Sequence, residues 1–187
     1  MKKIKLGTLL SEINEKTTEN NQFEVLTSSQ NGIVSQSDYF NKQVASTDTK
    51  GYKIVRKGQF TYRSMSDTGK FYINMLNDKD IGIVSPAYPV FELNSSSVLP
   101  RYLELYFKSN YFQRQISNQS TGSTRLALKY KKLCDLDFII PSIDTQKEAI
   151  RVFDLIHNNI EKHDKALFLL NELIKSRFIC QEVSLCY

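Results

Sequence analysis

The sequence contains few of the residues that build disulfide scaffolds and metal sites. Of its 187 residues, three are cysteines and two are histidines. An odd number of cysteines without Cys-x-x-Cys spacing argues against a disulfide framework or a zinc site. His157 and His163 are six positions apart, so they cannot share a helical face as an i, i+4 metal pair. We therefore expect no metal site.

The motifs of common enzyme classes are also missing. The sequence has no Gly-x-Ser-x-Gly, no P-loop, no Gly-x-Gly-x-x-Gly and no Glu-x-Lys of the kind found in metal-dependent nucleases. Residues 85–88, Ser-Pro-Ala-Tyr, differ by one residue from the Ser-Pro-Pro-Tyr motif of DNA amino-methyltransferases. Those enzymes also need a glycine-rich cofactor loop and a larger Rossmann-like domain, which this sequence lacks. We therefore predict a protein that is not an enzyme.

Long apolar runs are absent as well. The first ten residues, MKKIKLGTLL, have a charged start but too few apolar residues for a signal peptide. No stretch approaches the length needed to span a membrane, so we expect a cytoplasmic protein without a membrane partner. Hydrophobic residues make up 41% of the chain, enough to build the core of one domain with an appendage.

The positive charge is concentrated in one segment. The whole chain has a formal net charge of +5. Between Arg101 and Lys132 there are seven basic residues and one acid, Glu104, so this segment alone carries +6. A surface that binds an anionic partner requires such a local positive field. The alternative is a solvated helix flank that binds nothing.

Short apolar segments separated by turn residues dominate the first half of the chain. They predict strands over residues 23–27, 33–34, 52–55, 59–63, 71–75, 82–85 and 88–93. Residues 99–117 have a helical period with an aromatic inner face and begin with Pro100. A last strand, residues 137–140, ends at Pro141. The pattern favours the α+β class, with a small, bent, mixed β-sheet domain and flanking helices over residues 1–143.

Apolar residues recur at spacings of three and four within residues 144–180. The members of this seam are Ala149, Phe153, Ile156, Ile160, His163, Leu167, Leu170 and Ile174. Heptad spacing of this length predicts one long C-terminal helix that forms a coiled coil with a partner helix. The alternative is packing of the stripe against its own domain. We expect Asp144 as the N-cap, and residues 181–187 form a tail that breaks the pattern.

Loops between the expected strands carry side chains that suit DNA. DNA readers need cations for phosphates, and amide, hydroxyl or guanidinium groups for base edges. The candidates are Gln30, Asn31, Gln36, Tyr62, Arg63, Ser64, Lys70, Ser123, Thr124, Arg125 and Lys129. One such loop alone is more often plain surface. Their combination with the basic segment favours double-stranded DNA as the partner.

Six stretches, in order along the chain, carry a family resemblance. They are residues 55–63 (VRKGQFTYR), 82–88 (GIVSPAY), 102–103 (YL), 122–125 (GSTR), 140–141 (IP) and 145–150 (TQKEAI). The set resembles the target-recognition half of a type I restriction-modification specificity subunit. The first stretch is similar to the family's Ile-Lys-x-Gly-Asp-hydrophobic strand-turn-strand. The last stretch departs from the family's Glu-Gln pair, because Thr145 replaces the glutamate.

The resemblance implies a non-catalytic subunit that reads one half of a split DNA site. Its long helix would be a spacer that pairs antiparallel with a counterpart and docks methyltransferase (modification) subunits. A restriction/translocase subunit would join the full complex. S-adenosylmethionine and ATP would bind those other subunits, so we expect no cofactor in this chain.

The length departs from the family pattern. Family members usually carry two recognition domains separated by two long helices, and this sequence has one of each. A half-length subunit would form a homodimer through Phe153, Ile156, Ile160, His163, Leu167, Leu170 and Ile174. Such a dimer would read a symmetric, interrupted site. The alternatives are a modulatory interaction subunit that does not read DNA, and a truncated, phase-variable fragment.

Overall fold

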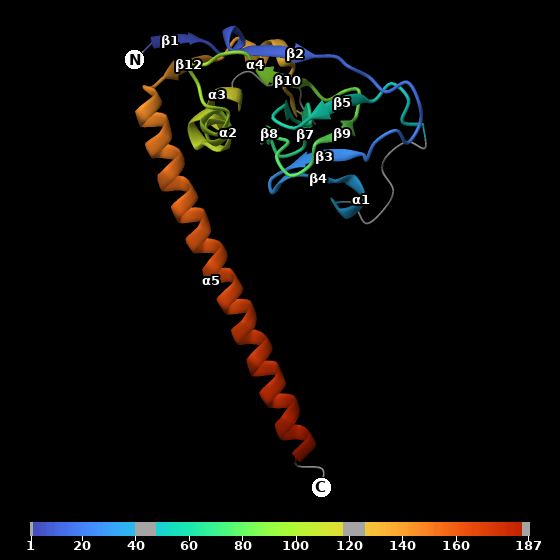
Figure 1. Cartoon of the computed structure of the whole chain (residues 1–187), viewed down its shortest axis with the longest axis vertical. Coiled ribbons are helices and arrows are strands. Elements are labelled where there is room, and N and C mark those ends of the chain that lie inside the picture. Colours follow the sequence, from blue (N-terminus) through green and yellow to red (C-terminus); the bar gives the residue numbers. More distant parts are fainter. Residues whose placement is uncertain (1, 40–47, 118–125, 185–187) are drawn as a thin grey trace. The chain divides into compact units, whose positions relative to one another are not determined.

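A computed structural model describes residues 2–39, 48–117 and 126–184 (Figure 1). The chain divides into two compact units, Met1–Gln146 and Lys147–Tyr187. The first unit contains all the strands of the described residues, and the second consists of the continuation of one long helix.

The first unit alternates short strands with short helices. The strands are β1 (Lys2–Lys5), β2 (Leu10–Ile13), β3 (Leu26–Ser29), β4 (Gly32–Ser35), β5 (Lys53–Arg56), β6 (Phe60–Thr61), β7 (Met65–Ser66), β8 (Asn74–Met75), β9 (Ile81–Val84), β10 (Val90–Leu93), β11 (Leu126–Ala127) and β12 (Asp137–Ile140). The helices are the 3-10 turn η1 (Leu6–Thr8), then α1 (Gln36–Tyr39), α2 (Pro100–Lys108), α3 (Asn110–Ser117), α4 (Tyr130–Cys134) and α5 (Ile143–Ser184). The sequence patterns did not predict α1 or α4.

The strands form five small sheets. One has four strands in the order β2-β10-β6-β8, and the others are the pairs β1-β12, β3-β4, β5-β9 and β7-β11. All of these ladders are antiparallel, and an isolated parallel bridge joins Val25 to Ile83. The predicted α+β class is confirmed, and the predicted bent sheet takes the form of these small antiparallel sheets. Ladders of two to four residues, separated by turns, leave no room for one wide sheet.

The core is aromatic, as the period of residues 99–117 predicted. Phe60 and Phe91 stack with ring centroids 5.5 Å apart, and Phe107 meets Phe60 edge-on at 5.8 Å. Phe112 from α3 lies 5.0 Å from Phe107. All four side chains are fully buried, so they lock α2 and α3 onto β6 and β10.

Helix α5 begins at Ile143, and its N-cap is Ser142 rather than the predicted Asp144. The Ser142 hydroxyl accepts a hydrogen bond from the backbone N–H of Thr145 at 3.2 Å, the contact an N-cap provides. Asp144 lies inside the first turn instead. Pro141 has no side-chain oxygen that could accept this bond, whereas the serine after it has a hydroxyl in the N-cap position.

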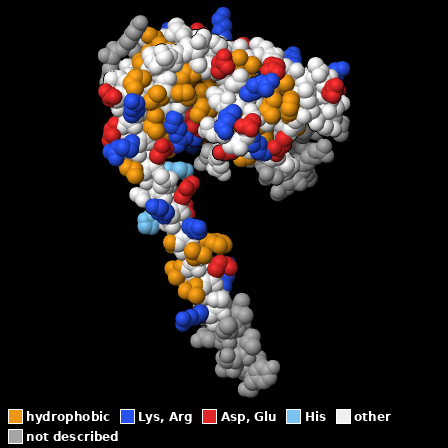
Figure 2. Space-filling view, viewed as in Figure 1, with side chains coloured by type: hydrophobic (Ala, Val, Ile, Leu, Met, Phe, Trp, Pro, Cys, Tyr) orange, Lys and Arg blue, Asp and Glu red, His pale blue; other side chains and the backbone are white. Residues whose placement is uncertain are grey.

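The apolar seam of α5 is exposed in the chain by itself. Phe153, Ile160, Leu167 and Leu170 are 42%, 52%, 59% and 52% exposed. Hydrophobic side chains are visible along this helix in Figure 2. The predicted helix is confirmed, and its coiled-coil partner stays a prediction.

Candidate nucleic-acid interface

A polar groove crosses the first unit around Lys70. Three adjoining cavities of about 250, 280 and 440 Å³ share lining residues, and Lys70 contributes to all three. Gln30 and Tyr72 line two of them, as do Asn110 and Gln113. We call this surface the Lys70 groove.

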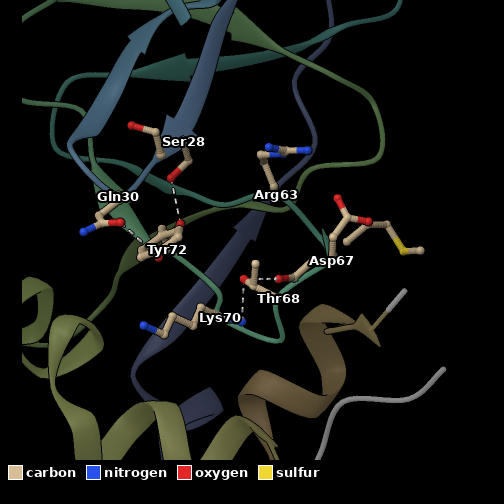
Figure 3. A pocket seen from close by; sticks show the side chains of 10 residues that line it. Ser28, Gln30, Arg63, Asp67, Thr68, Lys70 and Tyr72 are labelled. Atoms are coloured by element: carbon tan, nitrogen blue, oxygen red, sulfur yellow. Dashed lines mark hydrogen bonds between the residues drawn. The ribbon is translucent and has the colours of Figure 1, made fainter. Parts of the chain in front are cut away.

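Cations outnumber acids along the groove. Arg63, Lys70, Lys108 and Arg114 line it, and Asp67 is the one acid among its described lining residues. Figure 3 shows Arg63 and Lys70 on two sides of the first cavity, with Thr68 beside Lys70 and Asp67 to the right of both cations. This balance favours an anionic ligand, because positive charge on the walls of a cleft concentrates its field there.

The floor of the groove is held by a buried polar network. The Asn74 amide donates to the Ser28 hydroxyl and to the Ser29 carbonyl, both at 2.8 Å. The Ser28 hydroxyl donates in turn to the Tyr72 carbonyl at 2.7 Å. Asn74 is 2% exposed and Ser28 is 1% exposed, so these bonds are shielded from water. They fix the β3-β4 hairpin, which carries Gln30, against the segment that carries Lys70 and Tyr72.

Helix α3 holds the same segment from the other side. The Gln113 amide oxygen accepts from the Phe71 backbone N–H at 3.2 Å, and its nitrogen donates to the Phe71 carbonyl at 2.9 Å. The nitrogen also donates to the Phe107 carbonyl at 3.2 Å. The side chain of Phe71 is buried at the same point. The extended segment around Lys70 is therefore restrained on both sides by hydrogen bonds.

Gln30 presents its amide at the mouth of the first cavity. Its oxygen accepts from the Tyr72 hydroxyl at 3.4 Å, and its nitrogen points away from that bond (Figure 3). Gln30 is exposed and Tyr72 is half-buried. A glutamine that is oriented at a positively charged groove can read the edge of a base.

Comparison with known proteins identifies the family. The family model of the type I restriction modification DNA specificity domain matches residues 2–171. The chain belongs to this family. A relative, the specificity subunit of the type I restriction enzyme HindI from Haemophilus influenzae, is 25% identical over 130 residues. That match covers 67% of this chain and 28% of the relative.

Solved structures have the same fold. The S subunit of a type I restriction-modification system from M. genitalium matches with a TM-score of 0.54 and 14% identity, covering 86% of this chain and 40% of that one. The HsdS subunit of Thermoanaerobacter tengcongensis matches with a TM-score of 0.56 and 14% identity, covering 88% and 39%. A chain from a study of type I R-M complex assembly and conformational transition matches with a TM-score of 0.59 and 15% identity, covering 88% and 40%. This specificity domain spans well under half the length of the relatives that it matches.

The first family stretch, residues 55–63, builds a turn of the scaffold. Gly58 adopts a φ of +84° between β5 and β6, a conformation that favours glycine. The Gln59 side chain accepts from the Arg56 backbone N–H at 2.8 Å, where the family pattern has an aspartate. The Arg56 guanidinium pairs with Glu15 at 2.6 Å. In this specificity domain the stretch secures the chain reversal, and Arg56 and Gln59 lie outside the Lys70 groove.

Three predicted DNA-binding residues, Gln30, Arg63 and Lys70, meet in the first cavity of the groove. Asn31 is exposed beside them at the β3-β4 turn, and its backbone N–H donates to the Ser29 hydroxyl at 3.2 Å. Asn31 is not among the groove-lining residues. The structure thus brings together three of the predicted DNA-binding residues, and Asn31 lies beside them without lining the groove.

Ser64, Lys129 and Gln36 lie elsewhere. Ser64 and Lys129 line a separate cavity of about 330 Å³. Neighbouring residues of an extended chain point to opposite sides, which separates Ser64 from Arg63. Gln36 begins α1 at the far end of the β3-β4 ladder from Gln30, because Leu26 pairs with Ser35 and Ser29 with Gly32. The structure therefore does not bring these three residues to the Lys70 groove.

Tyr62 was predicted to contact DNA, and that prediction is wrong. Its side chain is 0% exposed, and its hydroxyl donates to the Leu128 carbonyl at 3.1 Å. Burial raises the pKa of its phenol far above the usual range, so the group stays neutral. Tyr62 is a core residue with one satisfied polar atom. The alternation that turns Arg63 outward turns Tyr62 inward.

Ser123, Thr124 and Arg125 lie outside the described residues. Sequence reasoning missed Tyr72, Asn110 and Gln113, which line the groove. The signal available for Asn110 and Gln113 was their place on a helix inside the basic segment. Nothing local distinguishes Tyr72 from other aromatic strand residues.

The basic segment is partly neutralised within the fold. Glu104 is 3% exposed and pairs with Arg101 at 2.6 Å and with Lys108 at 3.0 Å. Arg114, Lys131 and Lys132 are exposed. The segment therefore carries less available positive charge than its composition indicates, and Arg114 is the member that adds to the Lys70 groove without a described acidic partner.

Within the described ranges, no group of three or more His, Cys, Asp or Glu side chains is placed to hold a metal ion. The described helices include none that is both long enough and apolar enough to cross a membrane.

Burial raises the pKa of the Cys134 thiol, which favours its protonated form.

Proposed function

We propose that this chain is the DNA-recognition subunit of a type I restriction-modification complex and reads one half of a split target site. The observation that carries the proposal is the Lys70 groove, whose described lining includes four cations, one acid and Gln30, and the Gln30 amide is oriented by the Tyr72 hydroxyl. DNA recognition is the function of the family to which the chain belongs. In this role the chain binds and positions DNA, and its partner subunits perform the chemistry.

Different side chains of the groove suit different parts of a DNA duplex. Lys70 and Arg114 suit the contacts that neutralise phosphates and supply affinity for any DNA sequence, whereas Lys108 is paired with Glu104 within the fold. Gln30 offers an amide for a base edge, with adenine as its preferred bidentate partner in the major groove. Arg63 offers a guanidinium, whose preferred base partner is guanine.

The long helix supports assembly with other chains. An isolated helix with an exposed apolar seam is unstable in water, so α5 needs a partner surface. We assign that surface to a second copy of this chain and to methyltransferase subunits that dock on the helix. A homodimer would present two identical recognition domains and would read a symmetric, interrupted site.

DNA binding by the pure chain tests the recognition role. Affinity for a random-sequence duplex is measured at several salt concentrations for the wild type, Lys70→Ala and Lys57→Ala. Lys57 is an exposed cation that does not line the groove and serves as the matched control. Lys70→Ala is expected to weaken binding and reduce the salt slope by about 1, with Lys57→Ala near wild type. Equal effects of the two variants would contradict the assignment of the groove.

The exposed apolar face of α5 favours one other function. In that case the chain binds methyltransferase or specificity subunits and modulates them without reading DNA. A salt slope near zero for the wild type, together with a stable complex with the methyltransferase subunit in sedimentation, would establish this alternative. Loss of that complex in the double variant Leu167→Asp, Leu170→Asp would locate the docking surface on α5.

A further inference from the structure

Met65 is a large apolar side chain that lies exposed between two cavities of the first unit. It is 45% exposed, and it lines both the first cavity of the Lys70 groove and the separate cavity that contains Ser64 and Lys129. We call the separate one the Lys129 cavity. We infer that Met65 contacts the 5-methyl group of a thymine in the major groove of DNA. This inference rests on the DNA-reading role of the proposed function and names one feature of a base that is read.

The short ladder of β7 and β11 carries Met65 between the two cavities. In its register Met65 lies opposite Ala127, and Ser66 lies opposite Leu126. Directly opposed residues of an antiparallel pair point to the same face. Met65 and Ala127 therefore share one face, and both line the Lys129 cavity. Leu126 points to the other face and packs against the core.

Buried residues hold the base of this ladder. The Leu128 backbone N–H donates to the Ser64 carbonyl at 2.9 Å, and the Leu128 carbonyl accepts from the Tyr62 hydroxyl at 3.1 Å. Leu128 and Tyr62 are both 0% exposed. Met65 therefore extends from a restrained strand, as a side chain that reads a base requires.

The surroundings of Met65 distinguish it from other exposed apolar residues. Single apolar side chains are common on protein surfaces and need no function. Tyr111 and Ile139 are the other large hydrophobic side chains that are exposed in the described part of the first unit. Neither of them lines the Lys70 groove or the Lys129 cavity. Of the three, Met65 is the one placed at the surface proposed to bind DNA.

Cations lie on both sides of Met65. Lys70 lines the first cavity, and Lys129 lines the other, and both side chains are exposed. Lys53 also lines the Lys129 cavity, but it is paired with Glu12 at 3.8 Å. The two exposed lysines suit phosphates, which position a protein on the duplex while side chains between them reach the base edges. Met65 occupies such an intermediate place.

The contact surface next to Met65 is apolar. Ala87, Pro89 and Ala127 line the Lys129 cavity beside it. Among the four bases, thymine alone shows a methyl group in the major groove, and apolar side chains contact that group. The methionine thioether is flexible and polarizable, so it adapts its shape to such a group. The major groove is also wide enough to admit a two-stranded β-ribbon such as β7-β11.

Replacing thymine by uracil tests the contact, because it removes the methyl group and keeps the base pair. Duplexes that the wild-type chain enriches from a randomised library are copied with either thymidine or deoxyuridine triphosphate, and the Kd of the full-length chain is measured for both copies. The wild type is expected to bind the thymine copy about fourfold more tightly, the effect of burying one methyl group. Met65→Ala is expected to bind both copies equally, whereas Met65→Leu keeps an apolar side chain and should retain most of the preference.

Tyr111→Ala is the matched control, since it removes an exposed apolar side chain away from both cavities and should leave the wild-type preference intact. Equal binding of the two copies by the wild type would overturn the inference, and so would a thymine preference that survives in Met65→Ala. A Met65→Ala variant that loses affinity equally for both copies, with the preference unchanged, would instead show a wedge between bases. In all of these outcomes selective DNA binding stands. If the wild type enriches no duplex, the recognition role fails and the inference fails with it.

Discussion

The side-chain oxygen of Gln146 accepts a hydrogen bond from the backbone N–H of Leu99 at 2.8 Å. Its nitrogen donates to the Ser97 carbonyl at 2.9 Å and to the Pro141 carbonyl at 3.0 Å. Gln146 is 0% exposed, and each of these bonds is part-buried. The glutamine of the family's Glu-Gln pair thus ties the first turn of α5 to the loop before α2.

Replacing Gln146 by alanine is expected to lower the free energy of unfolding by about 2–4 kcal/mol. The change leaves one backbone N–H and two carbonyls without their side-chain partner at a part-buried place. Urea unfolding followed by circular dichroism measures the effect. Lys147→Ala changes the next, exposed residue and is expected to stay within about 0.5 kcal/mol of the wild type. Equal stabilities would show that water replaces the amide.

Tyr62→Phe separates a core role from a DNA-binding role. The hydroxyl that bonds the Leu128 carbonyl is lost, and the ring remains in place. We expect the free energy of unfolding to fall by about 1 kcal/mol and the DNA affinity to stay unchanged. Denaturant unfolding and DNA titration of the same preparation check both. A selective loss of DNA affinity would return Tyr62 to the interface.

Gln30→Ala is expected to relax the choice of base at one position of the recognised site. A good bidentate contact contributes about 1–3 kcal/mol of discrimination against the wrong base. Competitive selection from a randomised duplex library measures preference at each position. Asn31→Ala is the control, because Asn31 is exposed next to Gln30 but does not line the groove. If both variants lower affinity equally for all sequences, Gln30 is not a reader.

Gln113→Ala is expected to weaken DNA binding without touching a DNA-facing charge. Gln113 bonds the backbone of Phe71 in both directions, next to Lys70. Its loss should cost about 1–3 kcal/mol of stability and let the segment around Lys70 move. Gln115 lies on α3 like Gln113, and Gln115→Ala, which removes one hydrogen bond to Tyr106 of α2, serves as the control. Hydrogen exchange at residues 70–74 should rise in the first variant alone.

Much of the fold was predictable because it follows from local periodicity. Spacing alone predicted the long helix over residues 144–180, which the structure has over 143–184, and the aromatic helical region of residues 99–117, which forms α2 and α3. The number of sheets did not, because pairing is decided by contacts between distant segments such as β1 and β12. The cap at Ser142 was missed for a different reason. Ser142 and Asp144 are both good N-caps, and only the geometry after Pro141 chooses between them.

The sequence predicted the types of side chain that line the groove better than it predicted which particular residues line it. Gln30, Arg63 and Lys70 were singled out by residue type, and they meet because β3 and the 70–74 segment are joined through Asn74. Tyr62 was misassigned because the side to which each side chain points, rather than the residue type, decides that Tyr62 is buried and Arg63 is not. The place of Gln113 on a helix in the basic segment was visible in the sequence, but its role was not, because that role depends on the backbone of a segment 42 residues away.

Gln113 and Ser28 hold the segment of residues 70–74 by hydrogen bonds to the main chain of Phe71 and Tyr72. None of these bonds involves a side chain of that segment. Hydrogen bonds to the main chain do not depend on the identity of the neighbouring side chains. Positions such as Lys70 and Thr68 can therefore diverge without unfolding the domain. Under the proposed function, the same framework could therefore accept new surface residues, and with them new target sequences, a few positions at a time.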